Sequence, residues 1–107
     1  MRKKLIAGNW KMYKTSDEAR AFLQDFLPLV AGHTRDEIVV CPPYTSVAAA
    51  IEEARGTNVA VGVQNVHWKA DGAYTGEISA PMLLSLGVTH VIVGHSERRQ
   101  YFGETDD

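Results

Sequence analysis

Four short apolar runs along the chain predict four buried β-strands. The runs cover residues 5–7, 38–41, 59–63 and 90–93. The last three are rich in valine and isoleucine and show no alternation of apolar with polar residues, which is typical of parallel strands covered on both faces. A parallel sheet, with its strands joined by helices, is therefore expected.

Three helical segments are expected between these runs. Residues 19–30 carry one apolar stripe with helical spacing, and Thr15 with Glu18 predicts a capping box at the start of this helix. An alanine-rich segment over residues 45–55 predicts the second helix, and residues 79–86 predict a short third one. Each segment is followed closely by a glycine, which commonly ends a helix.

The strict alternation of strand and helix predicts successive βαβ units with right-handed crossovers and parallel strands. No domain boundary interrupts this order, so residues 1–107 are expected to form a single domain. The connection over residues 66–78 is longer than the crossover needs. Loops of this length inside a compact domain commonly bind a ligand or contact a partner chain.

Composition and charge exclude several classes of function. Eleven basic and 13 acidic side chains leave a net charge of -2, so no basic surplus favours nucleic acid or an anionic membrane as a partner. The apolar runs are too short to span a bilayer or to form the core of a signal peptide. The single cysteine, Cys41, cannot form an intrachain disulfide, which favours a cytoplasmic location. One cysteine and scattered histidines provide no zinc set, and no glycine-rich phosphate loop follows a strand.

Parallel α/β proteins place their working face after the carboxyl ends of the strands. Polar groups cluster among the residues that follow the predicted strands, which are Asn9, Trp10 and Lys11; Pro42, Pro43 and Tyr44; Gln64 and Asn65; and Gly94, His95, Ser96, Glu97, Arg98 and Arg99. The ammonium of Lys11 suits a phosphate or a developing oxyanion. His95 can act as an acid, a base or a neutral hydrogen-bond donor.

Each of these signals has a plainer structural explanation when it is taken alone. A lysine at a strand end is commonly just solvated, and a histidine there is often structural. The aromatic residues are expected to pack rather than to form a cofactor site, and Cys41 is expected to be a small buried group. His33 and His90 are expected to have no role in catalysis, and His67 to pack.

Five blocks together resemble the triosephosphate isomerase family. The blocks are GNWKM at residues 8–12, CPPY at 41–44, QN at 64–65, GAYTGEIS at 72–79 and VGHSERR at 93–99. They match the family in order and spacing and extend over the whole chain. The resemblance implies an isomerase that interconverts dihydroxyacetone phosphate and glyceraldehyde 3-phosphate through an enediolate, without a metal or coenzyme.

The resemblance also implies a role for each matched residue. Asn9 and Lys11 would contact the substrate, and Lys11 would neutralise the charge of the phosphate and of the enediolate. His95 would polarise the carbonyl and move protons between the substrate oxygens. Glu97 would be the carboxylate beside Lys11 and Ser96.

A homodimer is implied as well. Thr75, at the tip of the long loop, would enter the neighbouring subunit beside its Lys11 and His95. Three further side chains would support this interface: Tyr74, Gln64 and Arg98.

The family folds as an eight-stranded (β/α)8 barrel of roughly 250 residues. The chain supplies strands one to four and helices one to three, so a partial barrel is expected. The glutamate base and most phosphate-binding loops of the family have no counterpart in these residues. The chain alone is therefore expected to be inactive, and its open edges to aggregate, to pair with a second copy or to bind the complementary C-terminal half. The alternatives are a half-barrel that binds phosphate weakly, a self-associating fragment and, less favoured, a flavodoxin-like binding domain.

Overall fold

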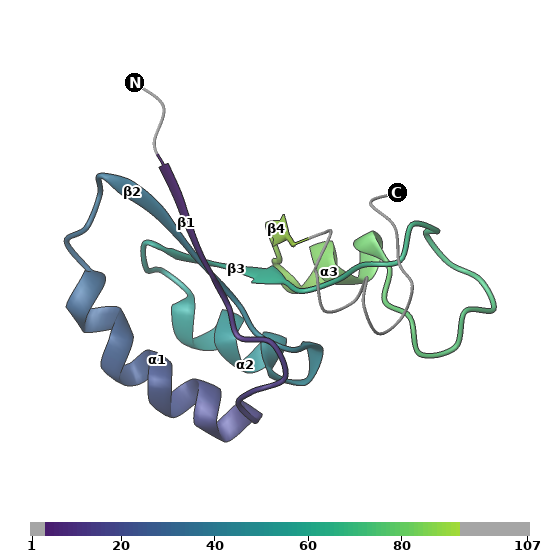
Figure 1. Cartoon of the computed structure of the whole chain (residues 1–107), viewed down its shortest axis with the longest axis horizontal. Helices are drawn as coiled ribbons and strands as arrows, with labels where there is room; N and C mark the ends of the chain where they lie inside the picture. Colours follow the sequence, from purple (N-terminus) through teal and green to yellow (C-terminus); the bar gives the residue numbers. More distant parts are fainter. Residues whose placement is uncertain (1–3, 93–107) are drawn as a thin grey trace.

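The computed structural model describes residues 4–92 (Figure 1). Strands and helices alternate in this part of the chain as expected. Their order is β1 (Lys4–Asn9), α1 (Ser16–Val30), β2 (Asp36–Cys41), α2 (Tyr44–Ala54), β3 (Val59–Val63), α3 (Ala80–Leu86) and β4 (His90–Val91). The predicted strands and helices are thereby confirmed, with β1 longer and the described part of β4 shorter than predicted.

The four strands form a parallel sheet in the order β1-β2-β3-β4. The register pairs Asn9 with Cys41, Val40 with Val61, and Gly62 with His90. Each neighbour in the sheet is also a neighbour in the sequence, and each pair is parallel, as expected for successive βαβ units. The carboxyl ends of the strands consequently lie along one edge of the sheet.

A capping box begins α1, and a proline lies in its last turn. The Glu18 backbone N–H donates to Thr15 Oγ1 over 3.3 Å, and the Thr15 N–H donates to Glu18 Oε1 over 3.0 Å. This is the predicted capping box, and it satisfies two backbone donors that a helix start leaves unpaired. Pro28 lies in the last turn, where the helix ends at Val30.

The apolar core lies between the sheet and the helices. Figure 1 shows α1 and α2 on one side of the strands, and Arg20 of α1 bonds Glu52 and Glu53 of α2 at 3.0 and 3.3 Å. The buried core residues are Leu23, Ile38, Val40, Val47, Ala50, Ala54, Val59, Val61, Val63, Leu83 and Val88. Alternate residues of β2 and β3 contribute to this set, so one face of each strand packs against the helices.

The outer strands do not match the expectation of four buried strands. Leu5 and Ile6 of β1 are 54% and 51% exposed, and Val91 of β4 is 41% exposed. Each outer strand has one neighbour within the described sheet, whereas β2 and β3 have two. The prediction was therefore wrong about burial at β1 and β4, and the expectation of open apolar edges is confirmed.

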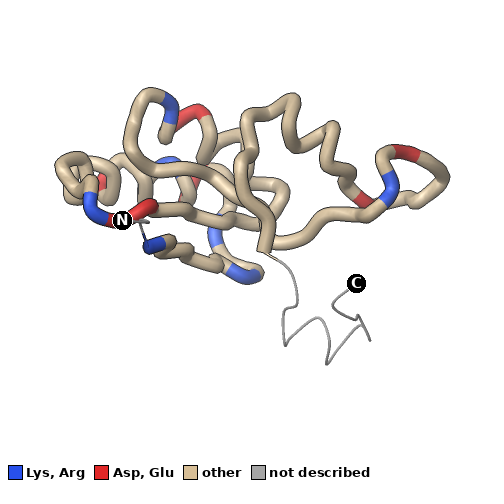
Figure 2. The backbone as a smooth tube through the Cα atoms, turned by 90° about the horizontal axis from the view of Figure 1, so that it is seen from above, with Lys and Arg blue, Asp and Glu red and all other residues tan. Residues whose placement is uncertain are grey.

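Charged residues of both signs are mixed along the chain. Figure 2 shows lysines and arginines close to aspartates and glutamates over the described backbone, including the long loop between β3 and α3. The mixture agrees with the small net charge of -2. None of the helices within residues 4–92 is long and apolar enough to cross a membrane.

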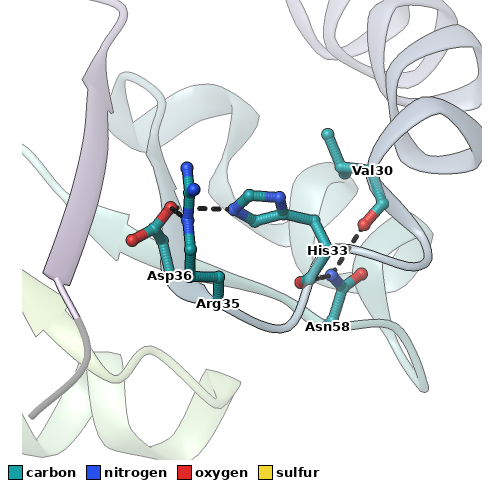
Figure 3. Close-up of polar contacts among 5 residues, drawn as sticks. All are labelled: Val30, His33, Arg35, Asp36 and Asn58. Carbon is teal, nitrogen blue, oxygen red and sulfur yellow. Dashed lines mark hydrogen bonds and ion pairs between the residues drawn. The ribbon is translucent and has the colours of Figure 1, made fainter. Parts of the chain in front are cut away.

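The amino end of β2 is closed by a polar cluster (Figure 3). His33 Nε2 lies 2.9 Å and Arg35 Nε 3.4 Å from Oδ2 of the buried Asp36. Asn58 donates to the carbonyls of Val30 and His33 at 2.8 and 2.9 Å. The cluster joins the end of α1 to the starts of β2 and β3, at the end of the sheet opposite to the strand carboxyl ends.

This cluster predicts acid sensitivity. The His33 hydrogen bond, helped by Arg35, lowers the pKa of the Asp36 carboxyl. The carboxylate therefore stabilises the fold above its unfolded pKa of about 3.9, and this contribution is lost as the pH falls through the lower folded pKa. Asp36→Asn should lower the melting temperature at pH 6, and the difference from the unmodified chain should shrink towards pH 2. Asp25→Asn, on the exposed side of α1, is the control; a difference that persists unchanged at low pH would contradict the mechanism.

Close packing at Gly62 gives a second prediction. A Cβ at this position would lie 2.9 Å from Cys41 Sγ and 3.0 Å from His90 Cβ, whereas one at Gly32 would meet nothing within 4 Å. Gly62→Ala should lower the free energy of unfolding by about 1–3 kcal/mol because the strands must separate to admit the methyl group. Gly32→Ala should change it by less than about 0.5 kcal/mol. Urea titration of both variants checks this, and equal effects would exclude steric crowding as the cause.

Candidate active site

The carboxyl ends of β1, β2 and β3 bring Asn9, Lys11 and Gln64 into one hydrogen-bonded group. Asn9 ends β1 beside Cys41 of β2, and Gln64 directly follows β3. Gln64 Nε2 donates to the Lys11 carbonyl over 2.8 Å and to the Cys41 carbonyl over 3.0 Å. One amide therefore joins the carboxyl ends of three strands.

The backbone of Lys11 is held in a left-handed conformation. Its φ is +53°, which is uncommon for a residue with a side chain and is strained. The Lys11 N–H donates to Asn9 Oδ1 over 2.9 Å, and its carbonyl accepts the bond from Gln64. The N–H and the carbonyl of Lys11 are thus both hydrogen-bonded to side chains at the strand ends. The residue itself is exposed.

The loop that carries Lys11 is also attached to the start of α2. Ser46 Oγ donates to the Lys14 carbonyl over 2.7 Å, and Ser16 Oγ donates to the Thr45 carbonyl over 2.8 Å. Lys14 has a φ of +76°. Fixed attachments at both ends of residues 11–16 limit the positions that the Lys11 side chain can reach.

Trp10 packs as expected from the sequence. Its ring meets Phe22 of α1 edge to face at 5.4 Å, and Phe22 stacks on Phe26 at 5.3 Å. Lys14 Nζ lies over the Phe22 ring at 4.9 Å, a distance typical of a cation–π contact. These contacts join the loop that follows β1 to α1.

The long loop between β3 and α3 projects from the end of the molecule away from α1 (Figure 1). Its tip folds back on itself, with the Tyr74 ring 4.3 Å from the His67 ring and the Glu77 N–H bonded to the Tyr74 carbonyl at 2.9 Å. Thr75 is exposed at this tip. The predicted contact loop therefore presents Thr75 outward.

Known proteins match this chain over its whole length. The family model described as triosephosphate isomerase matches residues 4–107. The chain is 60% identical over 107 residues to a triosephosphate isomerase from Solibacter usitatus, covering 100% of this chain and 43% of that protein. It is 58% identical over 106 residues to one from Moorella thermoacetica, covering 99% of this chain and 42% of that protein. The chain belongs to the triosephosphate isomerase family.

A solved structure of the family has the same arrangement. A triosephosphate isomerase from Bartonella henselae superposes with a TM-score of 0.88 at 38% identity, covering 97% of this chain and 43% of that one. The four parallel strands and their helices are thus a part of a TIM barrel, as expected from the sequence. The chain spans less than half the length of the curated relatives named above.

The structure describes some of the residues of the predicted triosephosphate isomerase site and leaves their roles as predictions. It brings together Asn9, Lys11 and Gln64, but the predicted residues His95, Ser96, Glu97 and Arg98 lie outside the described residues. The predicted convergence of Lys11 with His95 therefore stays a prediction. Within residues 4–92, no group of three or more His, Cys, Asp or Glu side chains is placed to hold a metal ion.

Gln64 has a role that the sequence analysis did not identify. The family resemblance placed it at the dimer interface, whereas its described bonds hold the backbone at Lys11 and Cys41. A signal was present in the strand pattern, because Gly62 lies beside Cys41 and Gln64 lies two residues further along the same face of β3. The strand pattern did not indicate that the loop after β1 brings the Lys11 carbonyl within reach of Gln64.

Cys41 is a structural residue at this edge. It is buried, and burial raises the pKa of its thiol. A hydrogen bond with the Gly62 backbone lowers the pKa by a smaller amount. A thiol with a raised pKa is a poor nucleophile near neutral pH. This confirms the expectation that Cys41 serves as a small buried group.

The two bonds of Gln64 predict a measurable loss of stability when its amide is removed. Gln64→Met keeps a similar side-chain length but leaves the Lys11 and Cys41 carbonyls without this donor. The free energy of unfolding should fall by about 1–3 kcal/mol. Gln24→Met, at an exposed position of α1, should have little effect. Urea titration compares the two variants, and an unchanged Gln64→Met chain would refute a supporting role for this amide.

Proposed function

We propose that the protein to which this chain belongs is a cytoplasmic triosephosphate isomerase. It interconverts dihydroxyacetone phosphate and glyceraldehyde 3-phosphate by proton transfer through an enediolate, without a metal or coenzyme. The observation that carries the proposal is the family match over residues 4–107 together with a lysine fixed at the carboxyl end of β1. Ligands of α/β barrels bind at this end of the strands.

Lys11 is the electrostatic centre of the proposed site. An ammonium held in place by its backbone stabilises the phosphate and the negative charge that develops on the substrate oxygens. Asn9, whose side chain orients the Lys11 N–H, contacts the substrate beside it. Support for these roles comes from the attachment of Lys11 at both of its peptide groups.

The other proposed roles rest on the family resemblance. His95 polarises the substrate carbonyl and moves protons between its oxygens, while Ser96 and Glu97 support His95 and Lys11. The glutamate that abstracts the proton in this family has no counterpart among the matched motifs. A base must act for isomerisation to occur. The 107-residue chain alone is therefore expected to have negligible turnover.

A homodimer through the long loop is part of the proposal. Thr75 would enter the neighbouring subunit near Lys11, supported by Tyr74, Gln64 and Arg98. Exposed apolar side chains around the two loops favour a protein contact, since Met12 is 93% and Trp68 76% exposed.

A second candidate is a half-barrel without catalytic activity that self-associates or binds phosphate weakly through Lys11. The exposed apolar side chains of β1 and β4 favour association of some kind, because unpaired strand edges are templates for further pairing. The same edges accept the complementary C-terminal half under the main proposal. Sedimentation of the chain at several concentrations, with and without that half, shows whether the edges pair with a second copy of the chain or with the C-terminal half.

Complementation tests the main proposal. The 107-residue chain is mixed with the portion of the Solibacter usitatus relative that lies beyond the matched region, and isomerase activity is followed with glyceraldehyde 3-phosphate. We expect negligible activity from either piece and clear activity from the mixture. Lys11→Ala should reduce kcat/KM of the mixture by a factor on the order of 10² or more.

A matched control separates a specific role of Lys11 from loss of positive charge. Arg55→Ala removes one cation from the end of α2. Arg55 precedes the start of β3 and so lies at the end of the sheet opposite to the strand carboxyl ends. This substitution should leave kcat/KM close to that of the unmodified mixture. Full activity of the Lys11→Ala mixture, or isomerase activity of the 107-residue chain alone, would refute the proposal. Phosphate binding by the chain without activity in the mixture would favour the second candidate.

A further inference from the structure

The base of the long loop is closed by a pair of residues from its two ends. His67 and Ser79 form an isolated parallel β-bridge, and the His67 N–H donates to the Ile78 carbonyl over 2.7 Å. This bridge sets the segment that follows β3 beside the segment that precedes α3. The loop that carries Tyr74 and Thr75 lies between these two points.

Two buried polar atoms at this bridge have no hydrogen-bond partner. They are His67 Nε2 and Ser79 Oγ, and they are the unpaired buried side-chain polar atoms found within residues 4–92. Ser79 is only 5% exposed, so its hydroxyl is out of reach of bulk water. Both residues line the same cavity of about 180 Å³. Because unpaired buried polar groups are costly, two such groups on bridged residues call for a common explanation.

The surroundings of His67 favour one of its two ring tautomers. Its Nδ1 faces Glu77 Oε2 at 3.8 Å. A carboxylate on this side attracts a proton to Nδ1, which favours the tautomer with the N–H on Nδ1 and a lone pair on Nε2. His67 therefore needs a donor on the side of Nε2.

Ser79 is a donor without an acceptor. It is the N-cap residue of α3, where a serine hydroxyl ordinarily bonds a backbone N–H of the first turn, yet its side chain makes no such bond. Its hydroxyl is thus available for another group. The needs of His67 Nε2 and Ser79 Oγ are complementary, and the bridge places the two residues side by side.

We propose that the Ser79 hydroxyl, which has no partner in the structure, turns to donate its proton to His67 Nε2 and that His67 Nδ1–H faces Glu77, forming a relay of carboxylate, imidazole and hydroxyl that positions the long loop. The Tyr74 ring lies 4.3 Å from the imidazole that the relay orients. A fixed imidazole therefore fixes Tyr74 and the direction in which the adjacent Thr75 projects. The value of this positioning for a partner contact rests on the proposed function.

The relay positions the loop and does not act as a nucleophilic site. The order of acid, imidazole and hydroxyl is that of enzymes that attack carbonyl groups through serine. A nucleophilic oxygen must be reachable by its substrate, and Ser79 Oγ is fully buried. The remaining charged groups that line the cavity, Lys69 and Asp71, lie on the exposed part of the loop.

Nitrogen NMR of the histidine rings tests the relay directly. Spectra of the ¹⁵N-histidine-labelled 107-residue chain are recorded at about pH 8.5, above the ordinary histidine pKa of about 6.5. We expect His67 to show a single tautomer with its proton on Nδ1. Ser79→Ala should give a mixture of tautomers at His67, and Ser79→Thr, which keeps the hydroxyl, should restore the single tautomer.

Amide exchange gives a second readout at the same bridge. The His67 N–H, bonded to the Ile78 carbonyl, should exchange about tenfold faster in Ser79→Ala. Ser85→Ala is the matched control, because the Ser85 hydroxyl bonds the Met82 carbonyl within α3 and lies outside the relay. It should change neither the tautomer nor the exchange rate.

The relay is overturned if His67 carries its proton on Nε2 in the unmodified chain. It is also overturned if Ser79→Ala leaves the His67 tautomer and the exchange of its amide unchanged. Neither measurement involves substrate or isomerase activity. A failed complementation assay with an intact relay signature would therefore count against the proposed function alone.

Discussion

The side-chain amide of Gln64 is the interaction on which the organisation of the site depends. Parallel pairing sets the ends of β1 and β2 side by side, and Gln64 at the end of β3 then reaches the carbonyls of both Lys11 and Cys41. The strained backbone of Lys11 is tolerated because its N–H and its carbonyl both have fixed partners. Under the proposed function, a lysine whose backbone is held in this way would need little reorganisation when a negative charge develops beside it, which is the usual source of electrostatic catalysis.

The two ends of the sheet serve different purposes. At the amino end, the cluster of His33, Asp36 and Asn58 joins a helix end to two strand starts and contributes to stability (Figure 3). At the carboxyl end lie the strained lysine loop and the long loop that presents Thr75. This separation is typical of α/β barrels, in which loops at the carboxyl end carry function and the opposite end carries stability.

The described sheet has open edges, which agrees with the chain covering less than half of its relatives. β2 and β3 are buried by strands on both sides and by α1 and α2, whereas β1 and β4 expose apolar side chains such as Leu5 and Val91. A barrel has no such edges, because its first and last strands pair with each other. The relatives are more than twice as long as the matched region, so the strands that would close the sheet have room in the portion beyond it.

Local patterns in the sequence determined the strands, the helices and the residue types at their ends. Apolar spacing, the Thr15–Glu18 capping box and the turn glycines depend on near neighbours, so the order of strands and helices could be predicted, as could the family from its motifs. The resemblance to an eight-stranded barrel predicted the open edges, whereas tertiary structure alone decided the left-handed backbone of Lys11 and the bonds of Gln64 to residues far away in the sequence. The same holds for the meeting of His67 and Ser79 across the long loop. The physical reason is that strand burial depends on the number of neighbouring strands, and long-range hydrogen bonds depend on where crossovers return the chain, neither of which has a local signal.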